Sequence, residues 1–113
     1  MWDAVQTVKN IYRIEYILLI VILSLFYVEI KGDWYFFFGV FFVFDVGAIG
    51  YLFSKKIGNI FYNLGHTLII PLLLFILCQL NLIVVSKWIL GFSIIWLIHI
   101  FFDRLLGWGL MPR

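Results

Sequence analysis

Charged side chains are scarce in this sequence, and their scarcity already limits the class of protein. Asp, Glu, Lys and Arg make up 12% of the 113 residues, about half the share in a typical soluble domain. Apolar residues account for 65% of the chain and aromatic residues for 21%. This composition excludes an ordinary soluble domain, because too few polar residues remain to cover its surface. The formal net charge of +2 is too small to indicate a nucleic-acid partner.

Cysteine, proline and polar linkers are also nearly absent. The single cysteine, Cys78, excludes an intrachain disulfide. No linker or low-complexity tract divides the chain, so we expect one domain over residues 1–113. The first apolar run is long and lacks a small-residue cleavage site, so we do not expect a cleavable signal.

The chain does have four long, continuously apolar runs. A membrane-spanning helix needs about 20 mainly apolar residues, and continuous runs favour helices over the alternating strands of a membrane barrel. We therefore predict an all-α, polytopic membrane protein with four transmembrane helices. Pro71 is expected to kink the third span, and glycines 47, 50 and 65 are expected to allow close helix packing. The predicted spans are about 14–30, 34–53, 60–80 and 88–110.

The basic residues predict how these spans are oriented. With four spans, both termini and the connection at 54–59 share one side of the membrane. Six of the eight lysines and arginines fall on that side, and the positive-inside rule makes it the cytoplasmic side. We expect a multi-pass protein of the bacterial inner membrane, with both termini in the cytoplasm. The six residues are Lys9, Arg13, Lys55, Lys56, Arg104 and Arg113.

Four ionisable residues lie inside these apolar spans, where a charged side chain is costly and usually has a function. Asp45 and His66 each lie ten residues from the basic connection, about 15 Å into the membrane at 1.5 Å per residue. His99 and Asp103 lie in the cytoplasmic half of the fourth span. Spans two, three and four thus bring ionisable groups to a similar depth, which indicates a shared site.

The residue types in this set suit two kinds of chemistry. His99 and Asp103 are four residues apart and project from one helix face. Imidazole and carboxylate groups suit zinc or another divalent metal, with Asp45, His66, His99 and Asp103 as ligands. The same groups suit acid–base catalysis, with His99, Asp103 and His66 as candidate catalytic residues. Candidates for binding a polar head group or phosphate of a substrate are Tyr62, Asn63, Arg104 and Glu15.

Structural roles are the alternatives for the same residues. Either aspartate is able to pair with Arg104 or Lys56 in an ion pair near the membrane surface. His66 and His99 are able to serve as interhelical hydrogen-bonding groups that hold the helices together. In both cases the polar residues would specify packing and carry no activity.

Three segments resemble a known family. They are FDVGAIGYL at 44–52, GNIFYNLGHT at 58–67 and HIFFDRLLGWGL at 99–110, with Arg13-Ile14-Glu15 near the start. Together they are similar to the bacterial domain-of-unknown-function 4260 family of small four-helix membrane proteins. The resemblance covers most of the chain and implies the same architecture and polar set, but it implies no reaction.

A weaker similarity connects the chain with predicted membrane-bound metal-dependent hydrolases. Their Pro-Asp-x-Asp element, Thr-His pair and late His-x-x-x-Asp correspond in order to Asp45, His66, His99 and Asp103. The sequence departs from that pattern at Phe44, at Gly47, which replaces the second aspartate, and at Thr67, which follows the histidine. The missing carboxylate puts a two-metal centre in doubt.

Three functions remain open from the sequence. The first is a metal-dependent membrane hydrolase that acts on a lipid-type substrate. The second is a small proton- or cation-coupled transporter or channel, in which Glu15, Asp45 and the histidines form a relay. The third is a non-catalytic accessory or immunity protein. We expect membrane lipids as partners, and a homodimer is left open.

Overall fold

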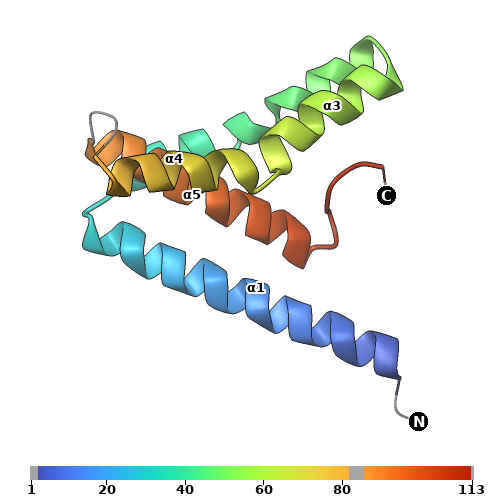
Figure 1. The fold of residues 1–113 in the computed structure, drawn as a ribbon, viewed down its shortest axis with the longest axis horizontal. Helices are drawn as coiled ribbons and strands as arrows, with labels where there is room; N and C mark the ends of the chain where they lie inside the picture. The colour runs from blue at the N-terminus through green and yellow to red at the C-terminus, as the bar shows by residue number, and fades with distance from the viewer. Residues whose placement is uncertain (1–2, 82–85, 113) are drawn as a thin grey trace.

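The computed structural model describes residues 3–81 and 86–112, and every regular element in these ranges is a helix (Figure 1). Four helical stretches are long and apolar enough to cross a membrane, at 4–29, 34–52, 55–79 and 87–105. Much of the predicted third turn (81–87) and Arg113 lie outside the described residues. The elements are α1 (Ala4–Glu29), α2 (Trp34–Phe41), the 3₁₀ helix η1 (Val43–Leu52), α3 (Lys55–His66), α4 (Ile69–Gln79) and α5 (Lys87–Leu105).

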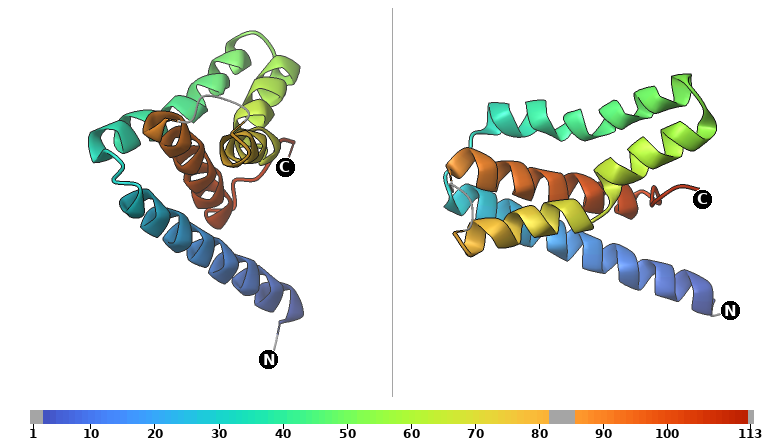
Figure 2. Two further views of the ribbon diagram at one scale, coloured as in Figure 1. Left: turned by 60° about the vertical axis from the view of Figure 1, so that its left-hand side comes forward. Right: turned by 45° about the horizontal axis from the view of Figure 1, so that its top comes forward.

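Helix α5 is the centre of the bundle. It contacts α1, α2 and α4, and Figure 2 shows it surrounded by the other helices. Most of its length is buried, whereas the other helices expose long rows of apolar side chains. The core joins α5 to α1, α2 and η1 through Tyr27, Phe37, Phe44, Ile94, Ile95 and Ile98.

The second stretch changes from α-helix to 3₁₀-helix at Phe42 and packs closely on α3. With three residues per turn, a 3₁₀ helix aligns Phe44, Gly47 and Gly50 on one face. A Cβ atom on Gly47 would lie 2.7 Å from the Phe61 carbonyl oxygen, and one on Gly65 would lie 2.9 Å from the Phe44 carbonyl oxygen. The expectation that these glycines allow close packing is confirmed.

The third stretch is broken, where the sequence predicted only a kink. Helix α3 ends at His66, Thr67 has an extended backbone (ψ 144°), and α4 begins at Ile69. Pro71 lies four residues after Thr67, so it has no N–H for the Thr67 carbonyl and its ring would clash with that carbonyl. The break leaves His66 at the end of α3.

The first and last helices of the chain begin or end at other residues than the predicted spans. Helix α1 begins at Ala4, where the Asp3 carboxylate accepts a hydrogen bond from the Val5 N–H (3.0 Å). Helix α5 ends at Leu105 because Gly107 adopts a left-handed conformation with φ 89°. The Trp108 and Gly107 N–H groups then bond to the carbonyls of residues 103 and 104, which forms a Schellman cap.

Candidate metal centre

The structure brings the four ionisable residues of the spans together. Asp45 comes from the start of η1, His66 from the end of α3, and His99 and Asp103 from successive turns of α5. One potential ligand atom from each residue lies within 4.8 Å of those from the other three. Segments far apart in sequence thus meet at one point, as their shared depth predicted.

Five close contacts link the ligand atoms of this cluster. His66 Nε2 lies 2.9 Å from Asp103 Oδ2 and 3.3 Å from Asp45 Oδ1. His99 Nε2 lies 3.1 Å from Asp103 Oδ2 and 3.2 Å from Asp45 Oδ1. The two Nε2 atoms are 3.3 Å apart. Both imidazoles therefore direct the same nitrogen at the same pair of carboxylate oxygens.

The orientation of His66 fixes which of its nitrogens carries a proton. Its Nδ1 lies 2.9 Å from the Tyr62 carbonyl oxygen, which only accepts hydrogen bonds, so Nδ1 is the donor. In a neutral imidazole the Nε2 atom then offers a lone pair to the cluster. The Tyr62 ring stacks on the imidazole at 4.0 Å between centroids, with the planes 8° apart. The hydrogen bond to the Tyr62 carbonyl and the stacked Tyr62 ring together orient the imidazole so that Nε2, the nitrogen that would bind a metal, points into the cluster.

The cluster has more hydrogen-bond acceptors than N–H donors when both imidazoles are neutral. Two carboxylate oxygens and the His66 lone pair converge, and a neutral His99 can supply at most one proton. His99 Nδ1 is buried and has no hydrogen-bond partner among the described residues. Within the same residues, no lysine or arginine lies within ion-pair distance of either aspartate. With both imidazoles neutral, the arrangement is therefore able to hold a cation.

The spacing fits a small tetrahedral ion. Zinc bonds to nitrogen and oxygen are about 2.0–2.2 Å long, which places neighbouring ligands about 3.4 Å apart at the corners of a tetrahedron. Five of the six distances among the four ligand atoms are 2.9–3.3 Å, and the sixth, between the oxygens of Asp45 and Asp103, is at most 4.8 Å. Two carboxylates and two neutral imidazoles carry a charge of −2, which a divalent cation neutralises. The donor set is also one that zinc accepts.

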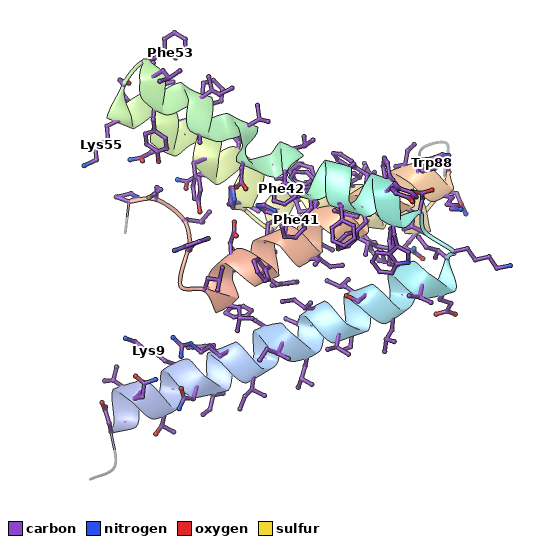
Figure 3. The ribbon with its side chains drawn as sticks, turned by 180° about the vertical axis from the view of Figure 1, so that it is seen from behind. Lys9, Phe41, Phe42, Phe53, Lys55 and Trp88 are labelled. Atoms are coloured by element: carbon purple, nitrogen blue, oxygen red, sulfur yellow. The ribbon has the colours of Figure 1, made fainter. Side chains whose placement is uncertain are left out.

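One side of the cluster is open. The side chains of His66, His99 and Asp103 are 2%, 1% and 9% exposed, whereas that of Asp45 is 53% exposed. Away from Asp45 the cluster is covered: Phe41 packs edge-on against the His99 ring, with 4.6 Å between the ring centroids. Figure 3 shows Phe41 near the centre of the molecule. A molecule reaching the cluster would therefore approach from the side of Asp45.

Of the two structural roles expected from the sequence, the ion pairs are not observed and the interhelical hydrogen bonds are. The ion pairs of Asp45 or Asp103 with Arg104 or Lys56 are absent from the described part of the chain. The interhelical hydrogen bonds of the histidines are present, because His66 on α3 contacts Asp103 on α5. They are contacts of the four-residue cluster itself.

The four residues predicted to bind substrate do not lie together in the structure. Tyr62 stacks on His66. The side chain of Asn63 donates to the carbonyl of Met111 (2.8 Å) and accepts from its N–H (2.7 Å), so it holds the C-terminal segment against α3. Glu15 is exposed on α1, and Arg104 lines a cavity between α1 and α5. Only Tyr62 contacts the cluster.

Sequence reasoning missed one residue that positions the cluster. Trp96 donates a hydrogen bond from its indole Nε1 to the Gly65 carbonyl oxygen (2.7 Å) and stacks on Phe44 (4.9 Å). It thereby connects α5 with the residues just before His66 and Asp45. The sequence could have indicated this role, because Trp96 lies three residues before His99 and therefore on the same face of the helix.

The fold and the cluster define an all-helical protein with four membrane-length helices and a His/Asp group able to hold a metal ion. The chain belongs to the family described as Domain of unknown function (DUF4260), whose family model matches residues 9–112. No curated protein and no solved structure matches the chain.

Proposed function

We propose that this protein is a metal-dependent hydrolase of the bacterial inner membrane that acts on a lipid-type substrate. Its four apolar stretches span the bilayer, and both termini lie in the cytoplasm. The apolar faces of the helices and the concentration of basic residues at one end of the bundle support this arrangement. The cluster then lies in the cytoplasmic half of the membrane, within reach of lipids.

One observation carries the proposal. Four electron-pair donors with a total charge of −2 converge inside a bundle whose helices are otherwise almost wholly apolar. Without a cation, two carboxylates lie within 4.8 Å of each other, and within the described residues neither has a lysine or arginine partner. A zinc ion held by His66, His99 and Asp103, next to the Asp45 carboxylate, would remove this repulsion.

The residues divide into two roles in this mechanism. His66, His99 and Asp103 are buried and would hold the ion, and a divalent ion bound there would supply the acidity that makes water a nucleophile. Asp45 is on the open side, where its carboxylate is placed to orient that water and accept its proton. The surrounding aromatic rings exclude bulk water, and the substrate approaches laterally from the lipid.

Elemental analysis of the purified full-length protein tests the metal centre directly. We expect one zinc or other divalent ion per chain, and its loss in the variants His66→Ala and His99→Ala. The matched control is Glu15→Gln, which removes an exposed carboxylate of α1 outside the cluster and should leave the metal content unchanged. Wild-type protein that holds no metal after incubation with zinc would contradict the proposal and favour a purely structural cluster.

The hydrolase activity requires its own test. Purified protein is incubated with inner-membrane lipids and zinc, and the products are identified by mass spectrometry. Lipid cleavage that disappears in Asp45→Asn, while that variant keeps its metal, would support the role given to Asp45. A metal-loaded protein that cleaves no lipid would refute the enzyme and leave only the metal site.

A further inference from the structure

A second polar site lies between the N-terminal half of α1 and the C-terminal end of α5. The cavity there has a volume of about 370 Å³, within the range of small-ligand sites. It is separate from the cluster, because Asp103 faces α3 and η1 whereas Arg104, the next residue of α5, lines this cavity. Its lining residues are Lys9, Tyr12, Arg13, Tyr16, Arg104, Leu105 and Gly107.

The charge of this cavity is uniformly positive. Lys9 and Arg13 are one turn apart on α1, and Arg104 approaches from α5. No aspartate or glutamate lines the cavity, and none of the three cations forms an ion pair within the described residues. In Figure 3 the Lys9 label marks the side of α1 that faces α5. Three cations gathered without a counter-charge favour an anionic ligand.

Arginine, lysine and tyrosine side chains suit a phosphate group in particular. Arginine binds phosphate oxygens through two parallel N–H groups, and lysine adds a compact charge. Tyr12 and Tyr16 add hydroxyl groups on the same face of α1. Tyr16 is held in place by stacking on Phe101 of α5, with 5.9 Å between ring centroids. The cavity therefore presents three cations and two hydroxyl donors to a single anion.

Exposed apolar side chains of α1 follow the polar cavity on its membrane side, among them Ile17, Leu18 and Val21. Free phosphate would use only the polar part. A phospholipid would place its phosphate among the cations and its acyl chains along these apolar residues.

We infer that this cavity binds the phosphate head group of an anionic phospholipid from the leaflet at the cytoplasmic end of α1. The inference depends on the proposed topology for the choice of leaflet, and it does not depend on the metal centre. Lipid binding and metal content are therefore measured separately, and failure of one leaves the other standing.

Calorimetric titration of the full-length protein in a neutral detergent tests this site. The ligands are dioctanoyl phosphatidic acid, dioctanoyl phosphatidylcholine and inorganic phosphate. We expect one phosphatidic acid per chain, and binding weakened about tenfold or more in Arg104→Gln and in Arg13→Gln. The matched control is Lys55→Gln, which removes an exposed cation of the first turn of α3, outside the cavity, and should bind as wild type does.

Each other outcome overturns a stated part of the inference. Equal weakening in Lys55→Gln, or equal binding of phosphatidylcholine, would show general attraction to detergent-bound lipid and no specific site. Inorganic phosphate that binds as tightly as the lipid would make free phosphate the ligand. Unchanged binding in both Arg13→Gln and Arg104→Gln would refute the site. Lost binding counts for the site only where the variant keeps the metal content and melting temperature of the wild type.

Discussion

Replacing Asp103 with asparagine should affect the stability of the metal-free and zinc-loaded protein differently. Without metal, the side chain of asparagine lacks the negative charge of Asp103, which lies close to that of Asp45. Its amide also has N–H groups to donate to His66 Nε2, 2.9 Å from Asp103 Oδ2 in the structure. With zinc, the same change removes a charged ligand. The variant should therefore lose its response to zinc without losing intrinsic stability.

The size of the effect follows from the geometry. Two carboxylate oxygens at most 4.8 Å apart repel each other by about 3.5 kcal/mol or more at an effective dielectric constant of about 20, and solvent screening of the 53% exposed Asp45 reduces this repulsion. Zinc at about 100 times its dissociation constant stabilises the folded protein by about 2.7 kcal/mol. At roughly 4 °C per kcal/mol, we expect the wild type to melt about 10 °C higher in zinc than in chelator. The Asp103→Asn variant should show almost no zinc-dependent shift and should melt no lower than wild type in chelator.

Thermal unfolding in detergent, at about pH 8, measures both differences, because protons compete weakly with metals for imidazole nitrogens at that pH. Glu15→Gln is the control, since it removes a carboxylate from α1 away from the cluster, and it should respond to zinc as wild type does. An equal drop in melting temperature for Asp103→Asn in zinc and in chelator would refute the reasoning. The cluster would then be a hydrogen-bonded structural element.

Four further variants test individual parts of the structure. Trp96→Phe removes the hydrogen bond to the Gly65 carbonyl in the last turn of α3 and should lower thermal stability by about 1 kcal/mol and weaken zinc binding in a titration. Asn63→Ala removes two hydrogen bonds to the C-terminal segment; we expect a loss of about 1–3 kcal/mol and faster hydrogen exchange there, with unchanged metal content. Gly107→Ala should cost about 1–2 kcal/mol in thermal unfolding because of its positive φ, whereas Gly109→Ala, which lacks this conformation, should cost less. Pro71→Ala should allow α3 and α4 to join, which hydrogen exchange would detect, and should weaken zinc binding by displacing His66.

The helices and the grouping of the polar residues could be predicted from the sequence because both depend on local pattern. Apolar runs of about 20 residues indicate spans, and the distance of Asp45 and His66 from a basic connection gives their depth. His99 and Asp103 share a face because of helical periodicity. Depth and face together place the residues near one another, and the structure brings them within 4.8 Å.

What sequence reasoning missed depends on contacts between distant segments. Asn63 was predicted to bind substrate, but its amide is occupied by backbone groups 48 residues later in the chain. Arg104 was grouped with the site residues, yet it lies on a different face of α5 from Asp103 and lines another cavity. Helical position alone could not show which neighbouring helix each face meets.

The departures from regular α-helix occur next to two residues of the His/Asp cluster, Asp45 and His66. The change to 3₁₀-helix at Phe42 precedes Asp45 by three residues, and the break at Thr67 directly follows His66. In a membrane such irregular backbone is tolerated only where protein or a polar cavity surrounds it, and changes of helix type often mark functional sites. A purely structural hydrogen-bonded cluster would not require both supporting helices to depart from regular geometry. Two such departures, each beside a ligand, therefore favour a site shaped for a bound ion over one that only holds helices together.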